Sequence, residues 1–278
     1  MSNDVVVEPK REDEELENGA GLAEEGDSGV SRDLLKEMIQ AGLWYGRKKN
    51  RTHPRMKPFI FMNRNGIEII DLVKTAKTLD TAIEFIKQIV RGGGNILFIS
   101  TQPSASAKVE EIAKKHNQPY ITNRWLGGIM TNFETISKRI EYFKKLKSDK
   151  ASGALDKYTK KEQVDFGKEI VRLSSFFSGI ENMTKLPGAV FMINISIHET
   201  ALREAIKLKI PVIAVISTDV DPSRITYPIP GNDSSVKSVE WIMDRISVAL
   251  AEAQAETNAA RLAEESRASA KTTENPKR

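Results

Sequence analysis

A short apolar run, Ile96–Ser100, constrains the fold more than any other segment of this sequence. A run of this length without polar alternation is typical of a strand that is buried on both faces. A segment with helical spacing, Ser104–His116, and a second short strand, Tyr120–Ile121, follow it. This β-α-β order predicts two parallel strands joined by a right-handed crossover, and therefore an α/β domain.

The same alternation of strand and helix returns in the C-terminal half of the chain. Apolar runs predict strands at Ala189–Asn194 and Pro211–Ser217. Helical spacing predicts a helix after each strand, at His198–Lys207 and Val236–Ala253. Together with a long helix expected at Asp71–Arg91, this order predicts an α/β fold. We expect a three-layer sandwich around a parallel sheet, of the flavodoxin-like type.

Two long helical segments interrupt this alternation. Apolar residues recur every three or four positions in Thr131–Ser148 and again in Thr159–Phe177, and a polar stretch, Asp149–Tyr158, joins the two. Two such helices with a short connection are expected to pair in antiparallel fashion. We therefore predict a coiled-coil helical hairpin at 131–178, inserted within an α/β domain that spans 31–254.

The segment before the long helix predicts one short helix and one β-hairpin. The helix is expected at 31–41, with a serine as its N-cap. Phe59–Met62 and Ile67–Ile70 are the expected strands, and Asn65-Gly66 between them favours a tight hairpin turn. The residues of Arg47–Lys57 are expected to form a loop.

Charge is distributed unevenly along the chain, whose net charge is +4. Residues 1–30 hold ten acidic and two basic residues, whereas the remainder holds 28 acidic and 40 basic ones. The acidic segment has few large apolar side chains, so we expect 1–30 to be a disordered extension. We expect 255–278 to be a polar tail whose first part extends the last helix. The basic body suggests a polyanionic partner, although a lysine-rich ordinary surface explains the charge equally well.

Composition argues against several classes of protein. No cysteine is present, which excludes disulfides, a thiolate nucleophile and thiolate metal ligands. No apolar run reaches the roughly 18 residues of a membrane-spanning helix. Residues 1–30 resemble neither a signal peptide nor a transit peptide. We therefore expect no membrane partner, and a protein that stays in the compartment where it is made.

Residues suited to catalysis or metal binding do not form a recognisable set. The loop Thr101–Ser104 lies at the sheet edge where α/β enzymes bind ligands, but it lacks the glycines that suit phosphate binding. The three histidines are scattered. Asp219, Asp221 and Asp233 fall among prolines and a glycine, a pattern that favours turns over a cation site. We expect no catalytic residue, no metal, no cofactor and no small-molecule substrate.

A basic segment beside aromatic residues is the strongest binding signal in the sequence. Six cations fall within eleven residues, with Trp44, Tyr45 and Phe59 beside them. Cations bind phosphates and aromatic rings stack on exposed bases, so this segment predicts contact with RNA. Lysines of the expected hairpin fit a second RNA contact or a solvated helix surface equally well. The six cations, named here the basic cluster, are Arg47, Lys48, Lys49, Arg51, Arg55 and Lys57.

One string, N-R-W-L-G-G-I-M-T-N-F at 123–133, resembles a signature of the bacterial-type small-subunit ribosomal protein 2 family. The resemblance extends from about residue 33 to about residue 253. Further strings agree with the family in the same order along the chain: Pro54–Ile60, Arg64–Ile67, Ile70–Leu72, Asp221-Pro222 and Tyr227–Asp233.

The resemblance implies an α/β sandwich with a protruding coiled-coil hairpin, in agreement with the pattern of strands and helices. It implies a non-catalytic constituent of the small (30S) ribosomal subunit, in the cytoplasm on the ribosome. The implied partners are 16S rRNA and neighbouring small-subunit proteins, including ribosomal protein 1, which the family helps to recruit. We add to the candidate RNA contacts five residues of the string and the hairpin: Asn123, Arg124, Thr131, Asn132 and Arg139.

The chain departs from the family pattern at four places. The family commonly shows His-Phe-Gly-His where this chain has Trp44-Tyr45-Gly46-Arg47, so two histidines are lost and a cation is added. Thr101-Gln102-Pro103 replaces a start that resembles Thr-Lys-Arg. Asn194 and Ser217 stand where the family usually has Asp.

Two other classes of function are weighed against this one. An α/β enzyme that binds a nucleotide or a sugar phosphate would need a glycine loop or a catalytic set, and the sequence offers neither. A coiled-coil interaction module that does not bind RNA is disfavoured by the basic cluster.

Overall fold

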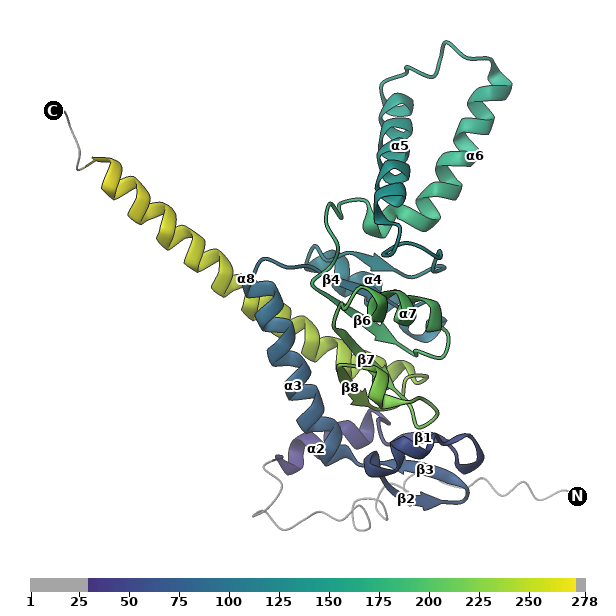
Figure 1. The fold of residues 1–278 in the computed structure, drawn as a ribbon, viewed down its shortest axis with the longest axis vertical. Helices are drawn as coiled ribbons and strands as arrows, with labels where there is room; N and C mark the ends of the chain where they lie inside the picture. The colour runs from purple at the N-terminus through teal and green to yellow at the C-terminus, as the bar shows by residue number, and fades with distance from the viewer. Residues whose placement is uncertain (1–29, 274–278) are drawn as a thin grey trace, which may run out of the picture.

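Two sheets organise the chain in the computed structural model, which describes residues 30–273 and the side chains of 30–259. One is a three-stranded antiparallel sheet near the N-terminus, and the other is a five-stranded sheet at the centre of the molecule (Figure 1). Residues 1–30 were expected to form a disordered acidic extension. Apart from Val30, these residues lie outside the described range.

The five-stranded sheet is parallel throughout, as the sequence predicts. Its order, β5-β4-β6-β7-β8, places the second strand outside the first and the remaining strands in succession on the other side. This is the order of flavodoxin-like doubly wound sheets. The strands are β4 (Ile96–Ile99), β5 (Tyr120–Ile121), β6 (Ala189–Ile193), β7 (Val212–Ile216) and β8 (Tyr227–Pro230).

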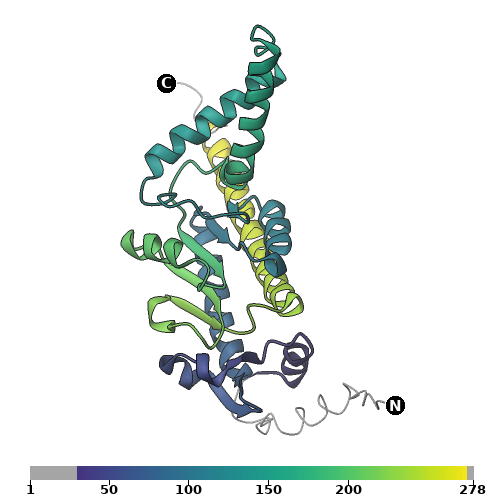
Figure 2. The ribbon, with the colours of Figure 1, turned by 90° about the vertical axis from the view of Figure 1, so that its right-hand side faces the viewer.

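Helices cover both faces of this sheet, which gives the three expected layers. Alternate residues of each strand point to opposite faces, so Phe98 and Phe191 join one core cluster while Leu97 and Val190 join the other. Figure 2 shows α7 and α8 on opposite sides of the sheet. The helices of the α/β domain are α2 (Arg32–Gln40), α3 (Leu72–Arg91), α4 (Pro103–Lys115), α7 (Glu199–Lys207) and α8 (Val236–Thr273).

Strand β8 was not expected, because the prolines at 228 and 230 favour a turn in the sequence. The backbone amide of Gly231 donates to the carbonyl of Ile216 on β7. Alternation along the strand therefore turns the nitrogens of Pro228 and Pro230 toward the free edge of the sheet. Proline is tolerated there because an edge strand needs no donor on its outer side.

The N-terminal sheet, in the order β1-β3-β2, corrects the expectation that Arg47–Lys57 forms a loop. The first two residues of the expected loop, Arg47 and Lys48, belong to a strand, β1 (Tyr45–Lys48), which pairs with β3 (Ile67–Ile70). The rest forms two short 3-10 helices, η1 (Lys49–Arg51) and η2 (Pro54–Phe59).

The expected hairpin is confirmed between β3 and β2 (Ile60–Arg64). Its corner residues, Asn65 and Gly66, have φ angles of 51° and 79°. Two consecutive positive φ values are those of the tight hairpin turn that Asn-Gly favours.

Two consecutive helices, α5 (Phe133–Ala151) and α6 (Lys160–Phe177), extend beyond the parallel sheet (Figures 1 and 2). Ile140, Phe143 and Leu173 of these helices belong to the core cluster beneath α7. The part of the α5–α6 pair that lies nearest the parallel sheet is thus continuous with the domain core. The coiled-coil packing expected for the pair remains a prediction.

Helix α8 continues past Ala253 to Thr273, so the first part of the polar tail extends the last helix, as expected. Among the side chains of α8 up to residue 259, Ala253 is the last that is fully buried. Among residues 30–273, the helices lack the combination of length and apolar character that a membrane span requires.

Candidate nucleic-acid interface

The basic cluster divides into cations that face solvent and cations that pair with the protein's own carboxylates. Lys48, Lys49, Arg51 and Lys57 are exposed, and their side chains form no ion pair with another residue of the described part of the chain. Arg47 and Arg55 instead form internal ion pairs. The first four cations are therefore available to a polyanion.

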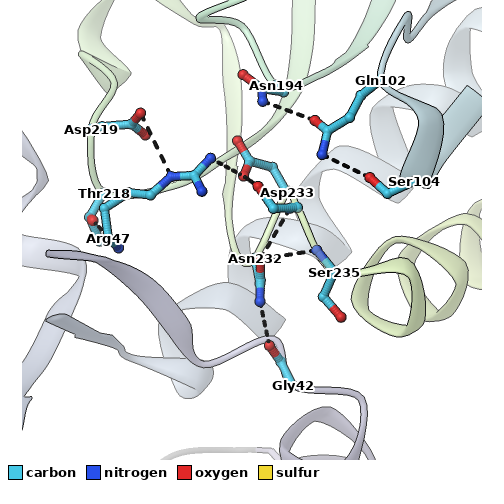
Figure 3. Close-up of polar contacts among 11 residues, drawn as sticks. Gly42, Arg47, Gln102, Ser104, Asn194, Thr218, Asp219, Asn232, Asp233 and Ser235 are labelled. Carbon is cyan, nitrogen blue, oxygen red and sulfur yellow. Dashed lines mark hydrogen bonds and ion pairs between the residues drawn. The ribbon is translucent and has the colours of Figure 1, made fainter. Parts of the chain in front are cut away.

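Arg47 connects strand β1 to the edge of the parallel sheet (Figure 3). Its Nη2 lies 2.8 Å from Oδ1 of Asp233, and its Nε lies 3.8 Å from Oδ2 of Asp219. Its backbone amide donates to Oγ1 of Thr218 at 2.9 Å. The guanidinium predicted to contact RNA is thus engaged inside the protein.

Asp233 is fully buried, and only one of its two carboxylate oxygens has hydrogen-bond partners within the described residues. Burial raises the pKa of Asp233 to about 6, although the charge of Arg47 and the hydroxyl of Ser234 act in the opposite direction. Burial penalises the charged form of a carboxyl, so Arg47 is needed to keep Asp233 ionised.

Arg55 is held by the turn that follows β7. Its Nη1 lies 2.7 Å from Oδ2 of Asp221 and 2.6 Å from Oγ of Ser223. The other oxygen of Asp221 accepts from the amide of Ser223, which starts the short helix η4 (Pro222–Arg224). The turn interpretation of Asp221 is therefore confirmed.

Glu204 of α7 organises the string 123–133. Its side chain is buried, and its two carboxylate oxygens accept five hydrogen bonds of 2.8–3.1 Å from that string. Burial raises the pKa of Glu204, but the hydrogen bonds outweigh burial and hold it below its ordinary value. The donors are Trp125 Nε1, the amides of Gly128, Met130 and Thr131, and the Thr131 hydroxyl.

Several residues of the string 123–133 therefore serve to bind the buried carboxylate of Glu204. Thr131, a predicted RNA contact, donates both its amide and its hydroxyl to Glu204. Trp125 is half-buried and packs against the core cluster beneath α7. Gly128 has a φ of +93°, which a residue with a side chain would adopt only with strain.

The remaining predicted contacts are exposed. Asn123 donates from Nδ2 to the carbonyl of Ser175 at 2.6 Å, which ties the string to α6. Arg124, Asn132 and Arg139 face solvent, and Arg139 lies on α5. The structure therefore brings the predicted RNA residues together in two groups. One lies with the N-terminal sheet and the other at the start of α5, toward the opposite end of the molecule (Figure 1).

The loop at the carboxyl end of β4 is filled by its own polar contacts. Asn194 Nδ2 donates to Gln102 Oε1 at 2.9 Å, and Gln102 Nε2 donates to Ser104 Oγ at 2.7 Å (Figure 3). His198 accepts from the amide of Thr101, and burial lowers the pKa of His198 to about 4. A neutral, hydrogen-bonded histidine at this edge fits a structural role.

The chain was compared with known protein families. The model of the family described as ribosomal protein S2 matches residues 38–253, which is most of the chain. The chain belongs to the ribosomal protein S2 family. The predicted family membership is confirmed, and with it the expectation of a ribosomal protein that is not an enzyme. Its expected location, on the ribosome in the cytoplasm, follows from this membership.

Curated relatives agree with this assignment. The chain is 43% identical to "Small ribosomal subunit protein uS2" of Fusobacterium nucleatum over 219 residues, which cover 78% of the chain and 89% of the relative. It is 41% identical to the protein of the same name in Dictyoglomus thermophilum, over 79% of the chain and 89% of the relative. For Bdellovibrio bacteriovorus, the identity is 39% over 80% of the chain and 71% of the relative.

Two residues important to this arrangement were missed in the sequence. Glu204 lies on the face of α7 that also carries the buried Ala201 and Ala205. A carboxylate at an otherwise apolar helix position signals a buried acid with specific partners. Asp233 was interpreted as a turn residue, and no local pattern indicates that a strand 186 residues away supplies its cation.

Proposed function

We propose that the chain is a structural constituent of the small ribosomal subunit that binds 16S rRNA through Lys48, Lys49, Arg51 and Lys57. The observation that carries this proposal is that these four cations are exposed and close in sequence, and that the described carboxylates pair with Arg47 and Arg55 instead. Phosphate contacts supply most of the affinity of such interfaces, because each one releases condensed counterions.

The names of the relatives support the same proposal, because they are small ribosomal subunit proteins. Within that subunit, we further propose that the chain contacts neighbouring proteins and supports the recruitment of ribosomal protein 1. Depletion of the chain should then lower the amount of ribosomal protein 1 that co-sediments with small subunits.

A second RNA contact is proposed at the start of α5, where Arg124, Asn132 and Arg139 are exposed. The pair α5–α6 is proposed to act as a coiled-coil hairpin at 131–178, inserted in an RNA-binding domain at 31–254. The burial of its side chains supports a paired hairpin. Leu146 and Leu173 are buried, whereas Val164 and Val171 on the outer side are exposed.

The experiment replaces Lys48, Lys49, Arg51 and Lys57 with Gln. Incorporation into small subunits is measured by sucrose-gradient sedimentation, and affinity for 16S rRNA is measured by filter binding across a salt series. A matched control loses the same charge from exposed lysines on other elements: Lys36, Lys77, Lys207 and Lys237 to Gln.

We expect the test variant to bind 16S rRNA more weakly than the control and to show a shallower salt dependence. The slope of log affinity against log salt should decrease by roughly 0.7–0.9 for each phosphate that the variant no longer neutralises. Equal incorporation of the two variants, at equal stability, would show that the basic cluster does not bind the ribosome.

A further inference from the structure

The register of the N-terminal sheet brings two exposed apolar side chains to the same face. Tyr45 of β1 and Met62 of β2 both pair with Ile69 of β3, so the three side chains form one row across the sheet. Tyr45 is 41% exposed and Met62 is 42% exposed, whereas Ile69 between them is buried. This row is an apolar patch in contact with solvent.

Cations occupy the next row on the same face. Lys48 and Arg64 both pair with Ile67, two residues from Ile69 on β3, and alternate residues of a strand share a face. Gly46, in contrast, lies against the parallel sheet, because a Cβ there would be 2.7 Å from the Thr218 side chain. The apolar row and its cations therefore belong to the outer face of the N-terminal sheet.

The aromatic ring of this patch is already held in place. The rings of Trp44 and Tyr45 stack with their centroids 3.6 Å apart and their planes 26° apart. Trp44 thus covers one face of the Tyr45 ring and restricts its rotation, while part of Tyr45 remains in contact with solvent. A third flat ring would continue the stack with little loss of conformational entropy.

We infer that the outer face of the N-terminal sheet binds an unpaired RNA base, stacked on Tyr45 beside Met62. The inference rests on the proposed function and specifies the kind of RNA that this surface selects. An exposed ring with the exposed Lys48 in the next row suits a nucleotide, because the base can stack on the ring while a phosphate meets the cation. A protein partner would suit a patch of larger apolar area with fewer cations around it.

The test compares two RNAs of equal nucleotide count, a stem with an unpaired loop and a fully paired duplex. Wild-type chain, Tyr45→Phe and Tyr45→Val are titrated with each RNA at a salt concentration that screens most phosphate attraction. Valine keeps the strand preference of the position but removes the ring. We expect Tyr45→Val to lose about tenfold in affinity for the loop RNA. It should keep its affinity for the duplex, and Tyr45→Phe should resemble the wild type.

A second measurement uses the unaltered protein, so it does not depend on the folding of a variant. The loop RNA carries 5-iodouridine either in the loop or in the stem, and crosslinked peptides are identified by mass spectrometry after irradiation. We expect the loop position to crosslink to Tyr45 and the stem position not to do so.

The outcomes separate this inference from the function on which it rests. If the wild-type chain binds neither RNA even at low salt, where phosphate attraction is not screened, the proposed function is wrong. If Tyr45→Val keeps the wild-type preference for the loop and no crosslink reaches Tyr45, RNA binding stands and the stacking site is wrong. The stacking site is also wrong if Tyr45→Val abolishes self-association of the chain and leaves RNA affinity unchanged, because the patch would then be a protein contact.

Discussion

The Nη2 atom of Arg47 lies 2.8 Å from Oδ1 of Asp233, although 186 residues separate the two in the sequence. Arg47 belongs to the N-terminal sheet, and Asp233 lies in the turn between β8 and α8. The pair therefore joins the two sheets of the molecule. Because Asp233 is fully buried, removing its cation would leave a carboxylate that has no compensating charge in the interior.

Arg47→Ala should destabilise the protein more at pH 8 than at pH 5. The folded-state pKa of Asp233, about 6, lies above its ordinary value of 3.8. Between these values the folded state binds the extra proton, so this group lowers stability as pH rises through that window. Loss of the Arg47 charge should raise this pKa further and extend the decline to higher pH. Urea unfolding of both proteins at the two pH values measures the difference.

The double variant Arg47→Ala, Asp233→Asn is the control for this explanation. Removing the buried carboxyl should abolish most of the additional pH dependence, because no buried group at that position can then ionise. If Arg47→Ala is equally destabilising at pH 5 and pH 8, the ion pair does not determine the effect.

Glu204→Ala should destabilise the folded chain by about 3 kcal/mol or more, because five donors of the string lose their acceptor. The matched control is Glu199→Ala on the same helix, which removes only partly exposed ion pairs to Arg203 and Arg224. That control should cost about 1 kcal/mol or less. Denaturant midpoints of the two variants test this difference, and equal values would contradict the role assigned to Glu204.

The contribution of Glu204 should also depend on pH, with the opposite sign to that of Asp233. Its pKa is lowered in the folded state, so its stabilising effect is fully present above the ordinary value of 4.5. The effect is lost as pH falls through the lowered folded-state pKa. The difference in melting temperature between wild type and Glu204→Gln should therefore shrink in acid, and a constant difference would argue against a charged Glu204.

Gly46→Ala should cost about 1–3 kcal/mol, because the new Cβ would lie 2.6 Å from the carbonyl oxygen of Glu68 and 2.7 Å from the Thr218 side chain. Gly127→Ala is the matched control, since a Cβ at that position has no atom within 4 Å. Chemical denaturation of both variants tests the expectation. A Gly46→Ala protein as stable as the control would mean that β1 moves away from the parallel sheet at little cost.

Replacing residues 147–166 with a short Gly-Ser linker should leave the domain folded but weaken its incorporation into small subunits. The replacement keeps Ile140, Phe143 and Leu173, which belong to the core cluster beneath α7. The melting temperature and the share of the protein that co-sediments with small subunits test the two halves of this prediction. Loss of cooperative melting would mean that the outer part of α5 and α6 also supports the core, and normal co-sedimentation would make it dispensable.

Features that follow from local periodicity were predictable from the sequence. The strand at Ile96–Ile99 and the helix at Leu72–Arg91 were expected within a few residues of their observed bounds, because burial sets their apolar patterns. The hairpin turn at Asn65-Gly66 was expected because few other residues adopt positive φ so readily.

Features that depend on distant partners were not predictable. Strand β1 contains Gly46 and two cations, a composition without strand preference, and it forms because β3 and Thr218 lie against it. The same limit applies to the site. Lys48 is exposed, whereas its neighbour Arg47 forms an internal ion pair. The two residues differ because they lie on different sides of the strand.

The two prolines of β8 have a consequence for how the molecule behaves among copies of itself. A parallel sheet ordinarily ends in a row of free amides, to which a strand from another chain can add. At Pro228 and Pro230 that row has no hydrogen to donate, and the pairing of β8 with β7 is unaffected. Because proline has no amide hydrogen, a strand from another chain cannot form a regular hydrogen-bond ladder along this edge. An aggregate built by strand addition would have to begin elsewhere on the molecule.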